Sequence, residues 1–463
     1  MIASVTHLPD EAFQFLKQTL GAENVSVTHA DREYHARDQS FHHAHMPAAV
    51  VFPENTAQVS AILKYANAQK IPVTAWGAGT SIEGNPIPVA GGIVMDFLRM
   101  DKILRVYEQD FQVDVQPGIK YKDMNAKLAA HGLFFAPDPG ANASIGGMVN
   151  NNAAGTRTPG YGATKDNVFR LEVVLANGDV IRTGTRSVKT SSGYDLVHLF
   201  IGSEGTLGIV TEATLRLYPI PEHFSAAVAS FDTIDGATQS VAAIMGAGLS
   251  PVALELVDPV TARNLNTTGE FHLHEKPTLL MEFHSATTQS IEHELALAQE
   301  LCNDNGCIFF EAGVGRAERD RLWKMRHSTY EVMVRNHPGI AFLICDVAAP
   351  VSKYPELVAA CEREINALGL AGASMVGHAG DGNLHPLVPY LPDDEASHAR
   401  AVQALGNMVR VALSLGGTAT GEHGVGLGKI PFMREEHGAS LDVMRALKNL
   451  FDPNGILNPG KMF

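Results

Sequence analysis

The fold of this chain is most clearly indicated by the segment DPGANASIGGMVNNNAAG, residues 138–155. It is too rich in glycine, asparagine and alanine for a regular helix or strand, and too apolar for a solvated linker. Two further glycine-rich segments, WGAGTSIEG at 76–84 and GSEGTLG at 202–208, also follow strand-like runs. Glycine lets the main chain approach an anion and turn several N–H groups toward it. Taken singly each loop would be an ordinary turn, but together they predict a phosphate-containing ligand.

The loops do not match the two common nucleotide-binding motifs. In the segment 76–84, Ile82 stands where a GxGxxG motif has its third glycine, and no GxxxxGK[ST] motif occurs. Around the loops the pattern is mixed: a strand at 48–52, a helix at 57–70 with Thr56 as its N-cap, and a hairpin turn at Asn177-Gly178. Strands and longer helices alternate after Pro221, and the last segment reads as one helix and a tail. We expect an α+β chain divided at 1–220, 221–415 and 416–463.

Composition excludes several classes of protein. The 463 residues carry a net charge of −15, from 35 Lys and Arg against 50 Asp and Glu, so nucleic acids and anionic membrane surfaces are poor partners. Four cysteines without a CxxC pair exclude a disulfide framework and a thiolate metal site. No basic segment precedes an apolar one at the N-terminus, and no apolar run is long enough to span a bilayer. These features predict a reduced, cytoplasmic protein.

The order of four segments carries a family resemblance. PAAVVFPENTAQVSAILKYA, VTAWGAGTSIEG, DPGANASIGGMVNNNAAG and GSEGTLGIVTEATLRLYPIPE resemble the FAD-binding domain of the vanillyl-alcohol-oxidase/p-cresol-methylhydroxylase (PCMH-type) flavoproteins. Between about Ala48 and Lys461 the chain is most similar to the branch with D-lactate dehydrogenases, glycolate oxidase flavin subunits and D-2-hydroxyglutarate dehydrogenases. The resemblance implies a two-subdomain FAD-binding domain at 1–220, an α+β substrate or cap domain at 221–415, and a C-terminal segment at 416–463 that returns to the flavin domain.

The resemblance also implies that the glycine loops hold FAD. The first loop has no histidine or cysteine to attach the flavin, so we expect non-covalent binding. In the C-terminal sequence NPGK, Asn458 is expected to approach the flavin ring. The other residues that correspond to flavin contacts of the family are Gly77, Ala78, Gly79, Thr80, Ser81, Gly84, Pro139, Gly140, Ala143, Ser144, Gly147, Gly155, Tyr161, Gly162, Glu204, Gly205, Gly208 and Val210.

A histidine-containing hairpin is predicted at GHAGDGNLHP, residues 377–386. If 380–383 form a four-residue turn, His378 pairs directly with His385, and two imidazoles so placed can chelate one divalent cation. Glu422, in GEHG at 421–424, could add a carboxylate and leave coordination positions open. From the residues alone, a plain cross-strand histidine pair is an equal alternative. The resemblance favours one zinc, manganese or iron ion with His378, His385 and Glu422 as ligands, and His423 as the active-site base.

The chemistry of the family explains why these residues are needed. Oxidation of a 2-hydroxy acid removes the hydroxyl proton and transfers hydride from Cα to flavin N5. A cation bound to the hydroxyl lowers its pKa, so that a histidine can take the proton. A substrate carboxylate is well bound by an arginine, and the family's arginine corresponds to Arg326 in LWKMRH, residues 322–327, with Lys324 and His327 as weaker candidates. An arbitrary arginine on a helix would more often be solvated.

The resemblance implies an FAD- and divalent-metal-dependent dehydrogenase, not NAD-dependent, that oxidises D-lactate to pyruvate. Electrons would pass to a cytochrome, a quinone or an electron-transfer flavoprotein, with peripheral membrane attachment through that acceptor as an alternative location. Glycolate and D-2-hydroxyglutarate stay open as substrates, since pocket shape decides between them. Two rival classes are a non-redox enzyme of the alkyl-dihydroxyacetone-phosphate synthase type and the flavin subunit of a multi-subunit glycolate oxidase. The oligomeric state, a homodimer included, is left open.

Overall fold

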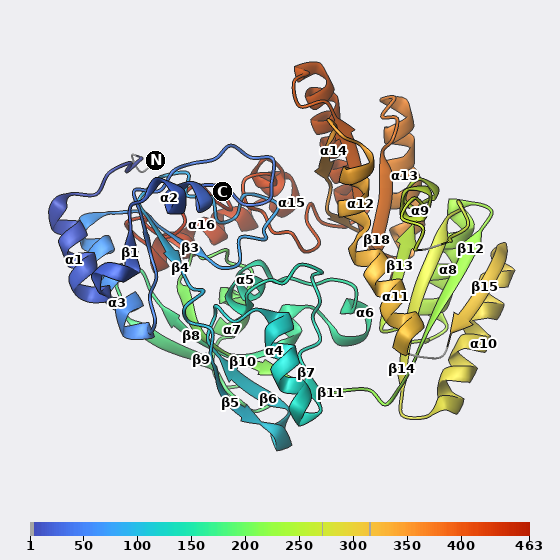
Figure 1. The fold of residues 1–463 in the computed structure, drawn as a ribbon, viewed down its shortest axis with the longest axis horizontal. Helices are drawn as coiled ribbons and strands as arrows, with labels where there is room; N and C mark the ends of the chain where they lie inside the picture. The colour runs from blue at the N-terminus through green and yellow to red at the C-terminus, as the bar shows by residue number, and fades with distance from the viewer. Residues whose placement is uncertain (1–3, 271, 314–315) are drawn as a thin grey trace. The chain divides into compact units, whose positions relative to one another are not determined.

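The computed structural model describes residues 4–270, 272–313 and 316–463 (Figure 1). The chain folds into two compact units. The first unit comprises Met1–Ala154, Gly162–Ile220 and Glu422–Phe463, and the second comprises Gly155–Tyr161 and Pro221–Gly421. None of the helices within the described ranges is long and apolar enough to cross a membrane.

The first unit contains a four-stranded, mainly parallel sheet with helices packed on it. In spatial order its strands are β1 (Val25–Ser26), β2 (Ala49–Val51), β4 (Ile93–Asp96) and β3 (Val73–Trp76). The helices of this part are α1 (Asp10–Leu20), α2 (His29–Tyr34) and α3 (Thr56–Gln69). Leu16 of α1 packs with Val59 and Ile62 of α3 in one hydrophobic core, and all three are fully buried. The helix predicted from the apolar spacing at 57–70 is therefore confirmed.

The N-cap of α3 is one residue earlier than predicted. Asn55 has an extended backbone and its side chain accepts a hydrogen bond from the main-chain N–H of Gln58, whereas Thr56 already belongs to the helix. The prediction of Thr56 is wrong because asparagine and threonine are both favoured at N-caps, and local preference does not separate them when they are adjacent.

A five-stranded antiparallel sheet forms the other layer of the first unit. In spatial order its strands are β5 (Ile103–Tyr107), β6 (Gln112–Val115), β10 (Ile209–Arg216), β8 (Val168–Val174) and β9 (Val180–Gly184). The predicted Asn177-Gly178 hairpin is confirmed, since β8 and β9 pair antiparallel on either side of it. The remaining elements here are α4 (Tyr121–Leu128), α5 (Ile145–Asn151), α7 (Leu196–Phe200) and the short pair β7 (Leu133–Phe134) with β11 (Tyr218–Pro219).

The C-terminal segment completes the first unit. It forms two helices, α15 (Met433–His437) and α16 (Ser440–Phe451), where the sequence predicted one. The helix is interrupted at Gly438, so the prediction of a single helix is wrong. Beyond α16 the tail runs beside β3: Val73 N–H donates to the carbonyl of Ile456, and Asn458 N–H donates to the carbonyl of Val73.

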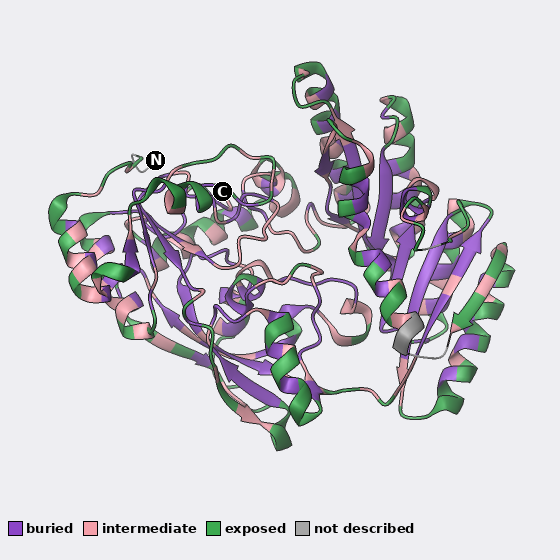
Figure 2. Ribbon diagram, viewed as in Figure 1, coloured by how far each residue is buried: buried purple, intermediate pink, exposed green. Residues whose placement is uncertain are grey.

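The second unit is built on one large antiparallel sheet. Figure 2 shows that the central strands are buried while residues on the outer sides of the helices are exposed. The strands, in spatial order, are β15 (Cys307–Gly313), β12 (His223–Phe231), β14 (Thr278–Ser285), β13 (Ala253–Val257), β18 (Ser374–His378), β19 (Asn383–Tyr390) and β16 (Ala341–Ile344), with β17 (Val347–Ala348) also paired to β19. The helices are α6 (Thr158–Tyr161), α8 (Ile234–Gly246), α9 (Pro259–Asn266), α10 (Thr288–Asp304), α11 (Arg316–His327), α12 (Thr329–Asn336), α13 (Tyr354–Ala367) and α14 (Glu395–Ser414).

One face of this sheet packs against α9, α11 and α12. Leu280 of β14 and Val257 of β13 share a hydrophobic core with Met325 of α11 and Val332 of α12. The residue pairing between β13 and β14 places Glu255 opposite Leu280. Because directly opposed residues of antiparallel strands project from the same face, Glu255 faces the helix that carries Met325.

Asp258 caps α9 and gives a stability prediction. Its carboxylate accepts a hydrogen bond from Thr261 N–H at 2.8 Å, and burial raises its pKa to about 6. The folded chain therefore binds this proton more tightly than the unfolded chain, and the carboxyl group's contribution to stability is lost as the pH rises from about 4 to about 6.

Asp258→Asn keeps the capping oxygen but cannot ionise. Between pH 4 and pH 7 the difference in unfolding free energy should shift in favour of the variant by about 2 kcal/mol. Urea unfolding at both pH values measures this, and an unchanged difference would contradict it.

Candidate functional site

The two predicted histidines lie next to each other on the sheet of the second unit. The imidazole ring centroids of His378 and His385 are 5.1 Å apart, ligating nitrogens of the two rings lie within 4.8 Å, and both residues are 6% exposed. The predicted neighbouring pair is confirmed. Its predicted register is wrong, because His385 lies opposite Val376 and not opposite His378.

The difference in register comes from the connection between the strands. Ala379–Asp381 form a 3-10 turn and Gly382 follows in the left-handed region with φ 82°, so the four connecting residues are 379–382 and not the predicted 380–383. Moving the turn by one position shifts the pairing of the two strands by two residues. Side chains alternate between the faces of a strand with a period of two. A shift by two residues therefore leaves both imidazoles on the same face.

A buried glutamate joins His378 to the predicted carboxylate-binding arginine. Oε1 of Glu255 lies 2.7 Å from Nδ1 of His378, and Oε2 accepts a hydrogen bond from Nε of Arg326, also at 2.7 Å. Burial alone would raise the pKa of Glu255, but the charges and hydrogen bonds of His378 and Arg326 outweigh it and hold the pKa below its usual value. Glu255 is thus an ionised carboxylate that accepts two hydrogen bonds.

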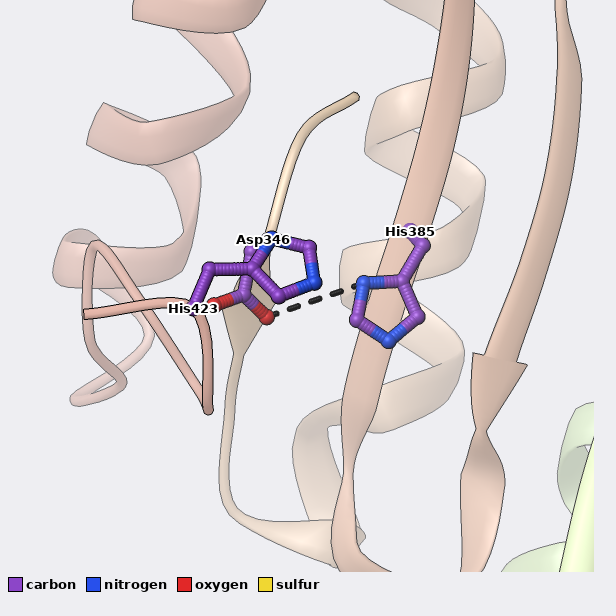
Figure 3. A group of neighbouring side chains, drawn as sticks. All are labelled: Asp346, His385 and His423. Atoms are coloured by element: carbon purple, nitrogen blue, oxygen red, sulfur yellow. Dashed lines mark ion pairs between the residues drawn. The ribbon is translucent and has the colours of Figure 1, made fainter. Parts of the chain in front are cut away.

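His385 also has a buried carboxylate behind it. Asp346, between β16 and β17, is 0% exposed and accepts hydrogen bonds from Asn383 Nδ2 at 2.8 Å and from Thr420 Oγ1 at 2.7 Å. Its Oδ1 forms an ion pair with His385 Nδ1 at 3.6 Å (Figure 3). Each imidazole therefore has an acidic partner that belongs to the same unit.

This donor set fits a divalent metal ion. A metal-ligating histidine usually donates its other ring N–H to a carboxylate or carbonyl, which fixes the tautomer and the orientation of the ring. His378 has that arrangement, because its Nδ1 is hydrogen-bonded to Glu255 Oε1 and Nε2 is the nitrogen that would ligate the metal. The alternative, a cross-strand histidine pair that binds no metal, gives no reason for a buried carboxylate behind each ring.

The other predicted residues of this region are placed as follows. Lys324 is exposed and donates to Glu270 at 2.9 Å, and His327 is exposed too. Gly421 ends the second unit and packs so closely on Asn383 and Asp346 that a Cβ there would overlap the Asn383 side chain. Glu422 and His423 follow it directly as the first residues of the last segment of the first unit. There the main-chain carbonyl of His423 accepts a hydrogen bond from Asn151 Nδ2 at 3.2 Å.

The three glycine-rich loops converge within the first unit. Gly77 lies directly against the hydroxyl of Ser144, which caps α5. Gly202 N–H donates to the carbonyl of Val149, and Glu204 N–H donates to the carbonyl of Asn150, both at 2.9 Å. Through these contacts with α5 and its N-cap, the three loops are held close to one another.

Some predicted flavin contacts also have structural partners. The Glu204 carboxylate accepts hydrogen bonds from Val425 N–H at 2.6 Å and Gly426 N–H at 2.9 Å. Burial raises the pKa of Glu204, against the effect of these hydrogen bonds. Asn458 Nδ2 donates to the carbonyls of Asn85 at 3.0 Å and Glu204 at 2.7 Å. Glu204 therefore ties the loop that follows His423 to the third glycine loop, and Asn458 ties the C-terminal tail to that same loop and to Asn85.

Tyr161, predicted among the flavin contacts, belongs to the second unit. Its hydroxyl lies 2.9 Å from Nδ1 of His284. The remaining predicted flavin contacts lie in the first unit or, in the case of Gly155, at the start of the segment Gly155–Tyr161 of the second unit.

Sequence reasoning missed Glu255 and Asp346. Both are single acids inside otherwise apolar strand-like runs, ALELV and AFLICDV. An acid at such a position is rarely buried unless it is paired. That signal could have identified both as partners of another functional group, although not which group.

Comparisons with known proteins agree with these observations. The model of the C-terminal domain of FAD linked oxidases matches residues 220–462, and the FAD binding domain model matches residues 47–184. The chain is 38% identical to the probable mitochondrial D-lactate dehydrogenase of Danio rerio over 450 residues, covering 96% of this chain and 90% of that protein. It is 37% identical to glycolate oxidase subunit GlcD of Bacillus subtilis over 453 residues, covering 97% and 96%. The structure of p-cresol methylhydroxylase with substrate bound superposes with a TM-score of 0.76 at 18% identity, covering 100% of this chain and 98% of that one.

Proposed function

Because this chain belongs to the FAD-linked oxidase family, with a PCMH-type FAD-binding fold and a C-terminal oxidase domain, we propose that it is an FAD- and divalent-metal-dependent dehydrogenase that oxidises D-lactate to pyruvate. One observation carries this proposal: the pair His378 and His385, each backed by a buried carboxylate, lies beside a buried arginine. Metal and carboxylate recognition are then available at one place on the sheet.

The proposed metal ligands are His378, His385 and Glu422. Glu422 is the residue after Gly421, which packs against Asn383 and Asp346. Consecutive Cα atoms are about 3.8 Å apart. Because Glu422 and His423 directly follow Gly421 in the chain, covalent connection alone keeps their backbone near Asp346, the carboxylate next to His385. A bound zinc, manganese or iron ion supplies Lewis-acid polarisation of the substrate hydroxyl.

The remaining steps fall to side chains of this protein. An imidazole nitrogen of His423 takes the hydroxyl proton, and Arg326 binds the substrate carboxylate through its Nη groups, since its Nε is held by Glu255. The converged glycine loops bind FAD non-covalently, and the bound flavin supplies the oxidant that accepts hydride from Cα. Electrons are then proposed to leave to a cytochrome, a quinone or an electron-transfer flavoprotein.

The choice of D-lactate rests on the relatives and is open to a direct test. The Danio rerio relative is named a D-lactate dehydrogenase, and the Bacillus subtilis relative a glycolate oxidase subunit. Glycolate is therefore the second candidate, and D-2-hydroxyglutarate the third. The cytoplasmic location stays a prediction, because the Danio rerio relative is named as mitochondrial.

Steady-state kinetics with an artificial electron acceptor test this proposal. We expect kcat/KM for D-lactate to exceed that for L-lactate by at least about 100-fold, because the enantiomer cannot present its Cα hydrogen while keeping its carboxylate and hydroxyl bound. NAD⁺ should not be reduced. A higher kcat/KM for glycolate or D-2-hydroxyglutarate would replace the proposed substrate. Absence of turnover with all three acids in metal-loaded protein would overturn the proposed activity.

A further inference from the structure

We propose that Glu255 is a positioning residue that holds the metal ligand His378 and the substrate-binding Arg326 with one carboxylate, so that metal affinity and substrate binding depend on the same buried group. The inference rests on the proposed function, which assigns the metal to His378 and the substrate carboxylate to Arg326. It adds a residue from a strand that none of the predicted motifs includes.

The position of Glu255 is set by the sheet. β13 pairs with β14 on one side and with β18 on the other, and Glu255 lies directly opposite His378 on β18. Opposed residues of antiparallel strands have Cβ atoms about 5 Å apart and project from the same face. The distance between the carboxylate and the imidazole is therefore determined by backbone pairing in the interior of a sheet.

Both oxygens of Glu255 are committed, each to a different partner. Oε1 is 2.7 Å from His378 Nδ1, and Oε2 accepts from Arg326 Nε at 2.7 Å. The Glu255 side chain is 0% exposed and the Arg326 side chain is 10% exposed. A buried charge that loses its partner is strongly destabilised, so removal of the carboxylate would leave the guanidinium without its counter-charge and free to adopt another orientation.

When the imidazole of His378 is neutral, the contact also sets its tautomer. An ionised carboxylate only accepts hydrogen bonds, so the proton of the neutral imidazole resides on Nδ1. Nε2 is then the nitrogen that would ligate a metal, and the carboxylate behind the ring would strengthen it as a ligand. On the other side, Arg326 with its Nε engaged presents its Nη groups in a fixed plane.

A second Arg–Glu–His arrangement on the same face provides a matched control. Glu282 of β14, with a side chain 1% exposed, accepts a hydrogen bond from Arg319 Nε at 3.1 Å and also bonds with Nε2 of His284. Arg319 and Arg326 are seven residues apart on α11, so they lie on the same side of that helix. Glu282→Gln removes a similarly buried charge that is also paired with an arginine and a histidine, through Oε1 alone, without touching His378 or Arg326.

The experiment compares Glu255→Gln, Glu282→Gln and the wild-type holoprotein. Divalent-metal affinity is measured by competition with a chromophoric chelator, using Zn²⁺ and Mn²⁺, and metal content by mass spectrometry. We expect Glu255→Gln to weaken metal binding by about 10- to 100-fold, and to raise KM for D-lactate even at saturating metal. Glu282→Gln should keep wild-type metal affinity. Glu255→Asp retains the charge on a side chain shorter by one methylene, so it should weaken metal binding by a smaller factor. It replaces Glu255→Gln as the test variant if the glutamine variant does not fold.

The outcomes separate this inference from the proposed function. Wild-type metal affinity in Glu255→Gln, or in Glu255→Asp where only that variant folds, overturns the inference while the wild type still binds metal and oxidises D-lactate. Equal loss of metal affinity in Glu255→Gln and Glu282→Gln also overturns it, because the effect would then be a general result of removing a buried charge. A wild-type protein that binds neither Zn²⁺ nor Mn²⁺ contradicts the proposed function itself and the inference with it.

Discussion

Replacing His385 with alanine is expected to release the divalent metal and to slow flavin reduction by D-lactate by about 10³-fold, equal to several kcal/mol of lost Lewis-acid stabilisation. The imidazole is one of two that meet edge to face with their ring centroids 5.1 Å apart. Its acidic partner Asp346 cannot replace it as a ligand without giving up its hydrogen bonds to Asn383 and Thr420. Metal content by mass spectrometry and anaerobic stopped-flow absorbance measure the two effects.

An exposed histidine of the same unit is the control for this substitution. His293 lies on the solvent side of α10, so His293→Ala should retain both metal and rate. Full metal occupancy together with a wild-type rate in His385→Ala would show that the ion is held by other residues.

The second large effect is expected for His423→Asn. Loss of a general base typically lowers the rate by about 10²- to 10⁴-fold, and asparagine preserves a polar side chain of similar length. Because His423 is not a proposed ligand, metal content should be unchanged, which distinguishes this variant from His385→Ala. The observable is the single-turnover rate of flavin reduction at saturating D-lactate.

The main-chain placement of His423 should survive this substitution. Its carbonyl accepts from Asn151, and the following N–H groups of Val425 and Gly426 donate to Glu204. None of these contacts uses the imidazole. Near-normal hydride transfer in His423→Asn would rule out the imidazole as the base, and loss of metal would mean that it is a ligand instead.

The local parts of the fold were the most predictable from the sequence. Apolar spacing at 57–70 identifies α3, and Asn177-Gly178 identifies the β8–β9 hairpin, because both signals depend on neighbouring residues. The adjacency of His378 and His385 follows from the same kind of reasoning, since a turn between two strands leaves them on one face. Their register was not predictable, because the 3-10 turn at Ala379–Asp381 depends on packing as well as on residue preference.

The partners behind the histidines were beyond the reach of sequence patterns. Glu255 and His378 are separated by 123 positions, and Asp346 and Asn383 by 37. Only the order of strands in the sheet, β14-β13-β18-β19, brings Glu255 to His378. Strand order depends on long-range pairing energies, so the sequence indicates a buried acid at 255 without indicating what it binds.

The central claim is that this protein holds FAD and reduces it with a D-2-hydroxy acid, and an anaerobic visible spectrum of the purified, metal-loaded protein tests it most directly. We predict an oxidised flavin spectrum that bleaches when D-lactate is added, with no change on addition of L-lactate. Repeating the titration with glycolate and D-2-hydroxyglutarate ranks the three acids on the same sample. A spectrum without flavin, or a flavin that stays oxidised with all three acids in the presence of metal, would contradict the account.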